Sequence, residues 1–134
     1  MVGHVLFVED DDFIRELYAD TLRRAGLIVH EERSAREALT GLKRRVPDLI
    51  LLDLGMPAGF MSGIEMLVRI RDIPQWAHIP VVVLSGLSDV VNPDVMARLN
   101  VSTIVSKTAI HGDELARLIG EILQRQNRGT GKVV

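Results

Sequence analysis

Chemically reactive side chains stand where apolar runs of this sequence end. Asp53 closes a continuous apolar run that begins after Pro47, and a turn rich in Gly and Pro follows at residues 54–57. Such a run predicts a strand buried on both faces. Its last residue then lies at the carboxyl edge of a sheet, where open α/β proteins bind ligands. Further polar residues end runs of the same kind: Glu9, Asp10, Ser85 and Lys107.

Together these residue types indicate phosphoryl chemistry. Glu9, Asp10 and Asp53 would crowd negative charge, which is costly unless a cation joins them. Their ligand atoms are all oxygens, a set that suits Mg²⁺. A carboxylate facing Mg²⁺ can attack a phosphoryl group, in a transition state that needs positioning and positive charge. Lys107 can supply such charge and Ser85 can donate to a phosphoryl oxygen, so the expected product is an aspartyl phosphate.

The elements that must position these residues alternate along the chain. Apolar runs predict strands, and apolar residues three or four apart predict helices. The expected strands are residues 5–8, 27–31, 48–53, 80–84 and 101–105, and the expected helices are residues 14–25, 34–42, 63–71, 89–99 and 115–122. The fourth helix is expected to be interrupted near its start by Asn92-Pro93. This alternation predicts an α/β fold of three layers, a parallel sheet with helices on both faces. In a doubly wound five-stranded sheet of order 2-1-3-4-5 with five helices, the reactive strand ends converge on one pocket.

The composition indicates one globular domain. The chain has 134 residues, 47% of them hydrophobic and 25% charged, as in a single folded domain. Its net charge of −2 gives no field that would attract nucleic acid, and no apolar stretch approaches the ~20 residues that a membrane helix needs. It has no cysteine, which excludes disulfides and thiol chemistry and fits a cytoplasmic protein without a signal peptide. Rossmann and P-loop glycine motifs are missing from the sequence.

Other polar and aromatic residues have structural explanations. Asp11 and Asp12 are expected at the N-terminal end of a helix, where acids favour the helix dipole. Ser34 is expected to cap a helix, because Glu37 follows at the capping-box spacing. Trp76 is expected to pack locally in a loop. The histidines are scattered without helix-face spacing, so we expect surface or loop positions for all four: His4, His30, His78 and His111.

The strand ends, in this order, resemble the motifs of receiver domains of two-component response regulators. The resemblance covers residues 3–124 and is carried by four segments: FVEDD at 7–11, LLDLGMP at 51–57, VLSG at 83–86 and IVSK at 104–107. It implies a chemotaxis-regulator-like, flavodoxin-like receiver domain over residues 1–124. Residues 125–134 are expected to form a flexible polar tail.

The resemblance also implies a role for each site residue. Asp53 would be the phosphoacceptor, and Asp10 and Asp53 would bind Mg²⁺ directly. The backbone carbonyl of Gly55 would be a third ligand, and Glu9 would act in the metal shell. The phosphoryl group would contact two further side chains, Ser85 and Lys107.

The implied function is a phosphorylation-dependent signalling switch. A sensor histidine kinase or a histidine phosphotransfer protein would supply the phosphoryl group, and a downstream protein partner or output domain would read the result. The chain would not be an enzyme beyond its own phosphorylation and slow autodephosphorylation. No contact with nucleic acid or membrane is expected, and the protein would be a monomer or a phosphorylation-dependent dimer.

Four departures from the family pattern bear on these expectations. The loop at 58–63 is two residues longer than usual. Thr108 replaces the usual Pro after Lys107, so a trans or strained peptide is expected there. Ile104 replaces an aromatic residue that commonly rotates when the switch fires. Gly55 and Leu87 offer no side chain that could hydrogen-bond an attacking water, which predicts slow loss of the phosphoryl group.

Two other functions stay open from the residues alone. A pseudo-receiver scaffold, which binds its partner without phosphorylation, is compatible with Ile104 and Thr108. A Mg²⁺-dependent phosphatase could use Asp53 as its nucleophile. Hydrolases of the haloacid dehalogenase type carry a second acid two residues after the nucleophile, where this sequence has Gly55.

Overall fold

Five parallel strands form the middle layer of the protein. The computed structural model describes residues 3–56, 61–86, 91–107 and 109–131, with the backbone alone for the last five of these. The strands are β1 (His4–Val8), β2 (Ile28–Glu32), β3 (Leu49–Asp53), β4 (Val81–Ser85) and β5 (Thr103–Ser106). Their order is β2-β1-β3-β4-β5, and every pair is parallel. The predicted fold class and strand order are confirmed.

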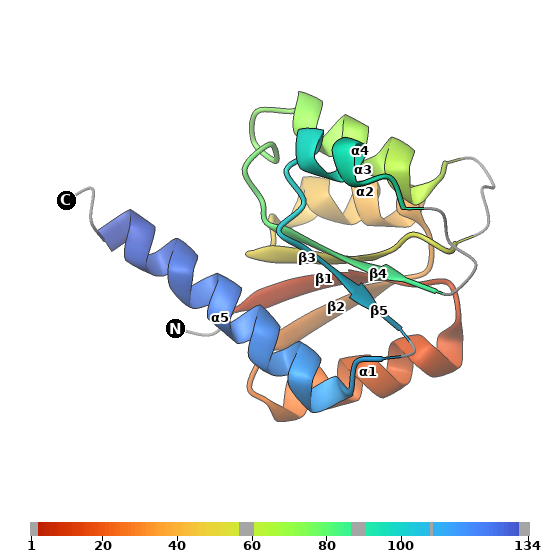
Figure 1. Ribbon diagram of the computed structural model, residues 1–134, viewed down its shortest axis with the longest axis vertical. Helices are drawn as coiled ribbons and strands as arrows, with labels where there is room; N and C mark the ends of the chain where they lie inside the picture. The colour runs from red at the N-terminus through yellow and green to blue at the C-terminus, as the bar shows by residue number, and fades with distance from the viewer. Residues whose placement is uncertain (1–2, 57–60, 87–90, 108, 132–134) are drawn as a thin grey trace.

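Five helices cover the two faces of this sheet (Figure 1). They are α1 (Asp12–Arg24), α2 (Ala35–Arg44), α3 (Gly63–Asp72), α4 (Pro93–Arg98) and α5 (Gly112–Gly131). Helices α2, α3 and α4 lie on one face, and α1 and α5 lie side by side on the other. Because side chains alternate along a strand, Leu6 and Val8 pack toward α2 and α3, whereas Val5 and Phe7 pack toward α1 and α5. Trp76 is buried in the core on the side of the sheet that faces α2 and α3, which confirms its predicted packing role.

Helix starts follow the chemistry of their capping residues. Asp11 caps α1 by accepting the Ile14 N–H at 2.9 Å, and Ser34 caps α2 by accepting the Glu37 N–H at 3.1 Å. Both caps satisfy backbone donors that a helix leaves free. Asp12 lies in the first turn of α1. The predicted positions of Asp11, Asp12 and Ser34 are therefore confirmed.

The fourth helix begins later than its apolar pattern predicts. Helix α4 starts at Pro93, because the Asn92 side chain caps it by accepting the N–H groups of Asp94 and Val95. Proline suits the first helical position and disfavours helix before it. The predicted interruption at Asn92-Pro93 is where the helix begins: residues 91 and 92 are not helical, and residues 87–90 lie outside the described residues.

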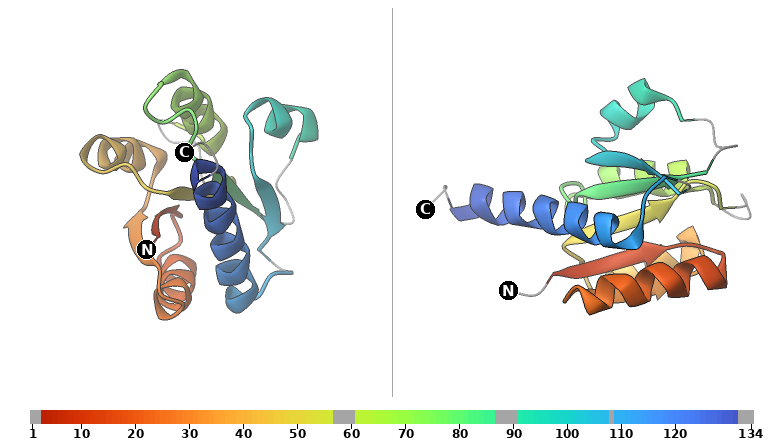
Figure 2. Two further views of the ribbon diagram at one scale, coloured as in Figure 1. Left: turned by 90° about the vertical axis from the view of Figure 1, so that its left-hand side faces the viewer. Right: turned by 60° about the horizontal axis from the view of Figure 1, so that its bottom comes forward.

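The last helix is longer than predicted. Helix α5 continues to Gly131 and projects past the sheet (Figure 2), beyond the predicted range of residues 115–122. Residues 124–126 are exposed, so the change to polar residues marks the end of burial rather than the end of the helix. The placement of residues 125–134 outside the domain stays a prediction. Among the described residues, no helix is long and apolar enough to cross a membrane.

Two of the histidines contact each other, which the sequence analysis missed. His4 lies on β1 and His30 on β2, with His4 Nδ1 and His30 Nε2 3.5 Å apart. Arg45 Nη1 is 3.2 Å from each of these two nitrogens. The two strands bring together residues that are far apart in the sequence. His78 and His111 are exposed, as predicted.

The environment of His30 leads us to expect that acid destabilises the protein. Burial, and then the charges of Arg45, His4 and Arg23, lower the pKa of His30 below its usual value. The unfolded chain therefore binds more protons below about pH 6.5, so the unfolding free energy should decrease as the pH falls from about 6.5. His30→Gln should show a weaker decrease than wild type in urea unfolding at pH 7.5, 6.5 and 5.5. A variant of the exposed His78, His78→Gln, should match wild type, and equal pH profiles for all three proteins would contradict the prediction.

Candidate functional site

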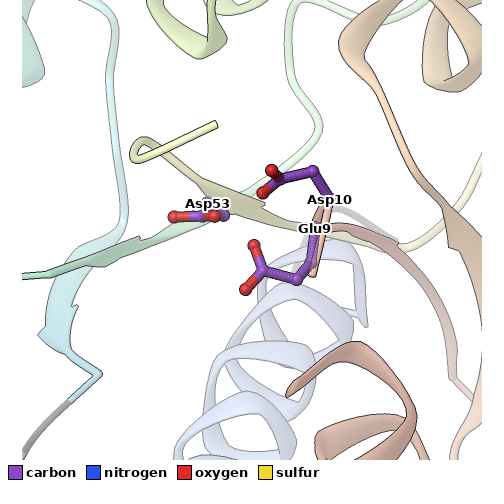
Figure 3. Close-up of side chains that lie close together, drawn as sticks. All are labelled: Glu9, Asp10 and Asp53. Atoms are coloured by element: carbon purple, nitrogen blue, oxygen red, sulfur yellow. The ribbon is translucent and has the colours of Figure 1, made fainter. Parts of the chain in front are cut away.

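Three carboxylates gather at the carboxyl edge of the sheet (Figure 3). Glu9 and Asp10 directly follow β1, and Asp53 is the last residue of β3. Each offers one oxygen that lies within 4.8 Å of the others. Glu9 and Asp53 are at most 1% exposed, whereas Asp10 is exposed. The cluster therefore has a buried floor and a side open to solvent.

Two donors fix the Asp53 carboxylate. The Gly55 N–H donates to Asp53 Oδ1 at 2.8 Å, as expected where the chain turns sharply after a strand. Lys107 Nζ binds the same oxygen at 2.8 Å. Both contacts orient the carboxylate through Oδ1.

Lys107 joins the site from the far edge of the sheet. The backbone N–H of Lys107 donates to the Ser85 carbonyl at 2.9 Å. Its side-chain Nζ contacts both Asp53 and, at 3.1 Å, Glu9 Oε1. Burial alone would lower the pKa of Lys107, but the bonds to Asp53 and Glu9 outweigh it and raise the pKa. The ammonium therefore stays charged between two buried carboxylates.

Glu9 has the least satisfied carboxyl group of the site. Its Oε1 pairs with Lys107, but its Oε2 is buried without a hydrogen-bond partner among the described residues. Burial, and then the nearby Asp53, raise the pKa of Glu9 to about 8. A buried carboxylate oxygen normally has a partner. The orphan oxygen, and three carboxylates facing one ammonium, fit a site that takes a hard cation such as Mg²⁺.

Because Glu9 is buried with an unpaired oxygen, we expect a neutral substitute to stabilise the metal-free protein. Between pH 4.5 and 8 the folded state binds more protons at Glu9 than the unfolded chain does, so the unfolding free energy falls as pH rises. With a chelator at pH 8.5, Glu9→Gln should raise the unfolding free energy by about 1 kcal/mol, and this gain should shrink toward pH 5. Urea titrations of both proteins measure it. Glu16→Gln, an exposed change on α1, should have no such effect, and a Glu9→Gln variant less stable than wild type at pH 8.5 would contradict the prediction.

The other predicted site residues lie at the same edge. Ser85 ends β4 beside Ser106 of β5 and is half-buried. Gly55 lies in the exposed turn after β3. Ile104 lies on β5 and is 39% exposed. Thr108, Leu87 and residues 57–60 of the longer loop lie outside the described residues, so the predictions about the Thr108 peptide, Leu87 and that loop stay untested.

Sequence reasoning missed one buried charge next to the site. Leu17 shares the helical spacing of the apolar residues of α1 but is exposed, whereas Arg15 is buried together with Ala19 and Leu22. The positions 15, 19 and 22 do have helical spacing. A charged residue at one of them hid this face from an analysis that followed apolar residues alone.

Comparison with known proteins agrees with this geometry. The family model described as "Response regulator receiver domain" matches residues 5–119. The KDP operon regulatory protein KdpE of Escherichia coli is 43% identical over 86 residues, which cover 64% of this chain and 36% of KdpE. CseB of Streptomyces avermitilis is 32% identical over 128 residues, which cover 96% of this chain and 52% of CseB. The chain thus spans about a third of KdpE and about half of CseB.

Relatives of similar size and solved structures extend the comparison. DivK, a polar-differentiation response regulator of Brucella ovis, is 32% identical over 88 residues, which cover 66% of this chain and 70% of DivK. A CheY-like receiver domain protein from Methanospirillum hungatei has a TM-score of 0.84 at 21% identity, covering 96% of this chain and 99% of that one. CheY4 of Vibrio cholerae has a TM-score of 0.78 at 24% identity, covering 90% and 98%. These two structures support the fold. The family match over most of the chain, with an acidic cluster at the expected sheet edge, shows that this chain belongs to the response regulator receiver domains of two-component signalling.

Proposed function

We propose that Asp53 accepts a phosphoryl group from a histidine kinase or a histidine phosphotransfer protein, and that this event changes the binding of a downstream partner or output domain. The observation that carries the proposal is the buried Asp53 carboxylate, paired with Lys107 at 2.8 Å inside a cluster of three acids. Family membership supports the histidine donor. A cytoplasmic location, where such donors present their phosphohistidine, is part of the same proposal.

Two contacts support Asp53 as the nucleophile. Gly55 and Lys107 both hold Oδ1, so Oδ2 is the oxygen we expect to form the bond to phosphorus. As that bond forms, the bond from phosphorus to the imidazole nitrogen of the donor breaks. The nitrogen keeps the electron pair and takes up a proton.

The acid cluster would hold Mg²⁺ during this reaction. Asp10, Asp53 and the Gly55 carbonyl are the proposed ligands, with Glu9 in the metal shell. When bound, the cation would supply positive charge to the phosphoryl oxygens, the chief electrostatic need of phosphoryl transfer. Lys107 would add a second positive charge, and Ser85 would donate a hydrogen bond to a phosphoryl oxygen.

The contacts of Ser85 and Lys107 with the phosphoryl group would set part of the free energy that favours the active state. Shifting a two-state surface from 1:99 to 99:1 needs about 5.5 kcal/mol of differential stabilisation. Charge-assisted hydrogen bonds from Ser85 and Lys107 can supply roughly 1.5–3 kcal/mol each. These contacts can therefore supply part of the bias if both form in one state alone.

Intact-mass spectrometry tests the proposal directly. Incubation with a small acyl phosphate and Mg²⁺ should add the mass of one phosphoryl group. The adduct should be absent without Mg²⁺ and absent in Asp53→Asn, but present in a control with an exposed acid changed, Asp20→Asn. An adduct that survives Asp53→Asn, or forms equally without Mg²⁺, would overturn the proposal. The decay of the adduct in the same samples tests the predicted slow autodephosphorylation.

A further inference from the structure

One guanidinium lies buried behind the acid cluster. Arg15 on α1 is 5% exposed, which is rare for a charged side chain unless its donors are satisfied. Its Nε donates to Glu31 on β2 at 3.2 Å, and its Nη2 to Asp12 in the first turn of α1 at 2.6 Å. Two carboxylates thus balance its charge. The third contact of Arg15 goes to the main chain.

That third contact holds the residue that begins the acid cluster. Arg15 Nη1 donates to the Glu9 carbonyl at 2.8 Å, a buried hydrogen bond. On its other side, the Glu9 N–H donates to the Glu32 carbonyl at 3.1 Å. Both polar groups of the Glu9 backbone are therefore occupied, one by β2 and one by α1.

The Glu9 carbonyl fixes more than one residue. A peptide unit is planar, so a bond that fixes this carbonyl also fixes the N–H of Asp10 and the directions in which the chain leaves toward both side chains. Glu9 and Asp10 supply two of the three carboxylates of the cluster. Their separation from Asp53 therefore depends on the orientation of the peptide that Arg15 holds.

We propose that Arg15 is a positioning residue for the cation site, which orients the Glu9–Asp10 peptide so that both carboxylates face Asp53. The proposal rests on the proposed function, in that the cluster must bind Mg²⁺. Charge and position act in opposite directions here. Removing a positive charge near a cation site should by itself tighten cation binding, whereas loss of the positioned peptide should weaken it.

Titration of the unphosphorylated protein with MgCl₂, followed by the backbone amide signals in nuclear magnetic resonance, separates the two effects. Arg15→Met, which keeps an unbranched buried chain, should bind Mg²⁺ about tenfold more weakly than wild type, equivalent to about 1.4 kcal/mol. Arg15→Lys should lie between them, because one ammonium cannot reach all three acceptors. Arg24→Met is the matched control, since Arg24 forms an exposed ion pair with Asp20 on the same helix, and it should bind Mg²⁺ like wild type.

The spectra also report whether each variant is folded. If Arg15→Met does not fold, Arg15→Lys serves instead, because it keeps the positive charge and loses only the planar fork that reaches the three acceptors. It should weaken Mg²⁺ binding about threefold. Binding by a folded Arg15 variant that equals or exceeds wild type would overturn the inference and leave the proposed function intact. Failure of wild type to bind Mg²⁺ would overturn both.

Discussion

Lys107→Met is expected to cost the metal-free protein about 3 kcal/mol of unfolding free energy, at the lower end of the range for breaking a buried ion pair. The ammonium pairs with Asp53 at 2.8 Å and Glu9 at 3.1 Å, and both acids are buried. Without it, two carboxylates face each other without a positive charge between them. Glu9 can then take up a proton, because its pKa is already raised to about 8, and this keeps the loss from being larger.

Urea unfolding at pH 8 in a chelator measures this cost. Adding Glu9→Gln to Lys107→Met should recover more than the about 1 kcal/mol that Glu9→Gln gains alone, since Glu9 then has no ion pair with Lys107 to lose. The two changes would then be non-additive, as expected for residues in contact. Lys43→Met, a change in the last turn of α2 away from the acid cluster, should cost much less. A Lys107→Met protein as stable as wild type would mean that the ion pairs contribute little to folding.

Arg71→Met should destabilise the protein by a similar amount, about 3 kcal/mol, through carbonyl groups rather than through charge pairs. Arg71 lies near the end of α3 and donates to Leu99 and Asn100 at 2.7 and 3.2 Å. It also donates to Ala77 and Ile79 at 2.9 and 2.8 Å. These carbonyls belong to the segments that lead into β4 and β5. Burial lowers the pKa of Arg71. No carboxylate among the described residues pairs with it, so its hydrogen bonds to carbonyl oxygens alone stabilise the buried guanidinium.

Thermal or urea unfolding of three variants tests this role. Arg71→Lys should recover only part of the loss, because an ammonium lacks the planar fork that reaches several carbonyls at once. Arg69→Met is the matched control, since Arg69 lies on the same helix and is exposed. If Arg69→Met and Arg71→Met lose the same stability, the carbonyl contacts do not hold these segments.

The sequence was informative wherever one residue type had one physical explanation. The central strands β3 and β4 are buried on both faces, so continuous apolar runs predicted them correctly. The positions of the reactive strand ends followed from the alternation of strands and helices. It was less informative where a side chain serves the backbone. Arg15 and Arg71 donate to main-chain carbonyls, and a carbonyl has no residue type that could mark it as an acceptor.

Element ends were also hard to predict for reasons that lie in local chemistry. Helix α4 begins after Asn92 because that side chain caps it, although apolar residues precede it. Strand β5 begins at Thr103 rather than residue 101, because Asn100 takes a left-handed backbone with φ of 54° in the turn before it. The His4–His30 contact depends on strand pairing, which no short-range pattern contains.

Because β5 lies at the edge of the sheet, we expect it to unfold locally more often than the strands that carry the acids of the site. Strands β1 and β3, which present the acids, each pair with two neighbours, whereas β5 pairs with β4 alone. Lys107 directly follows β5. Local unfolding starts where a segment has the fewest partners, so the amide hydrogens of β5 should exchange with solvent before those of β3. Each such opening would remove the ammonium while the carboxylates stay in place, and the frequency of these openings would then depend on which other positive charge the acid cluster has bound.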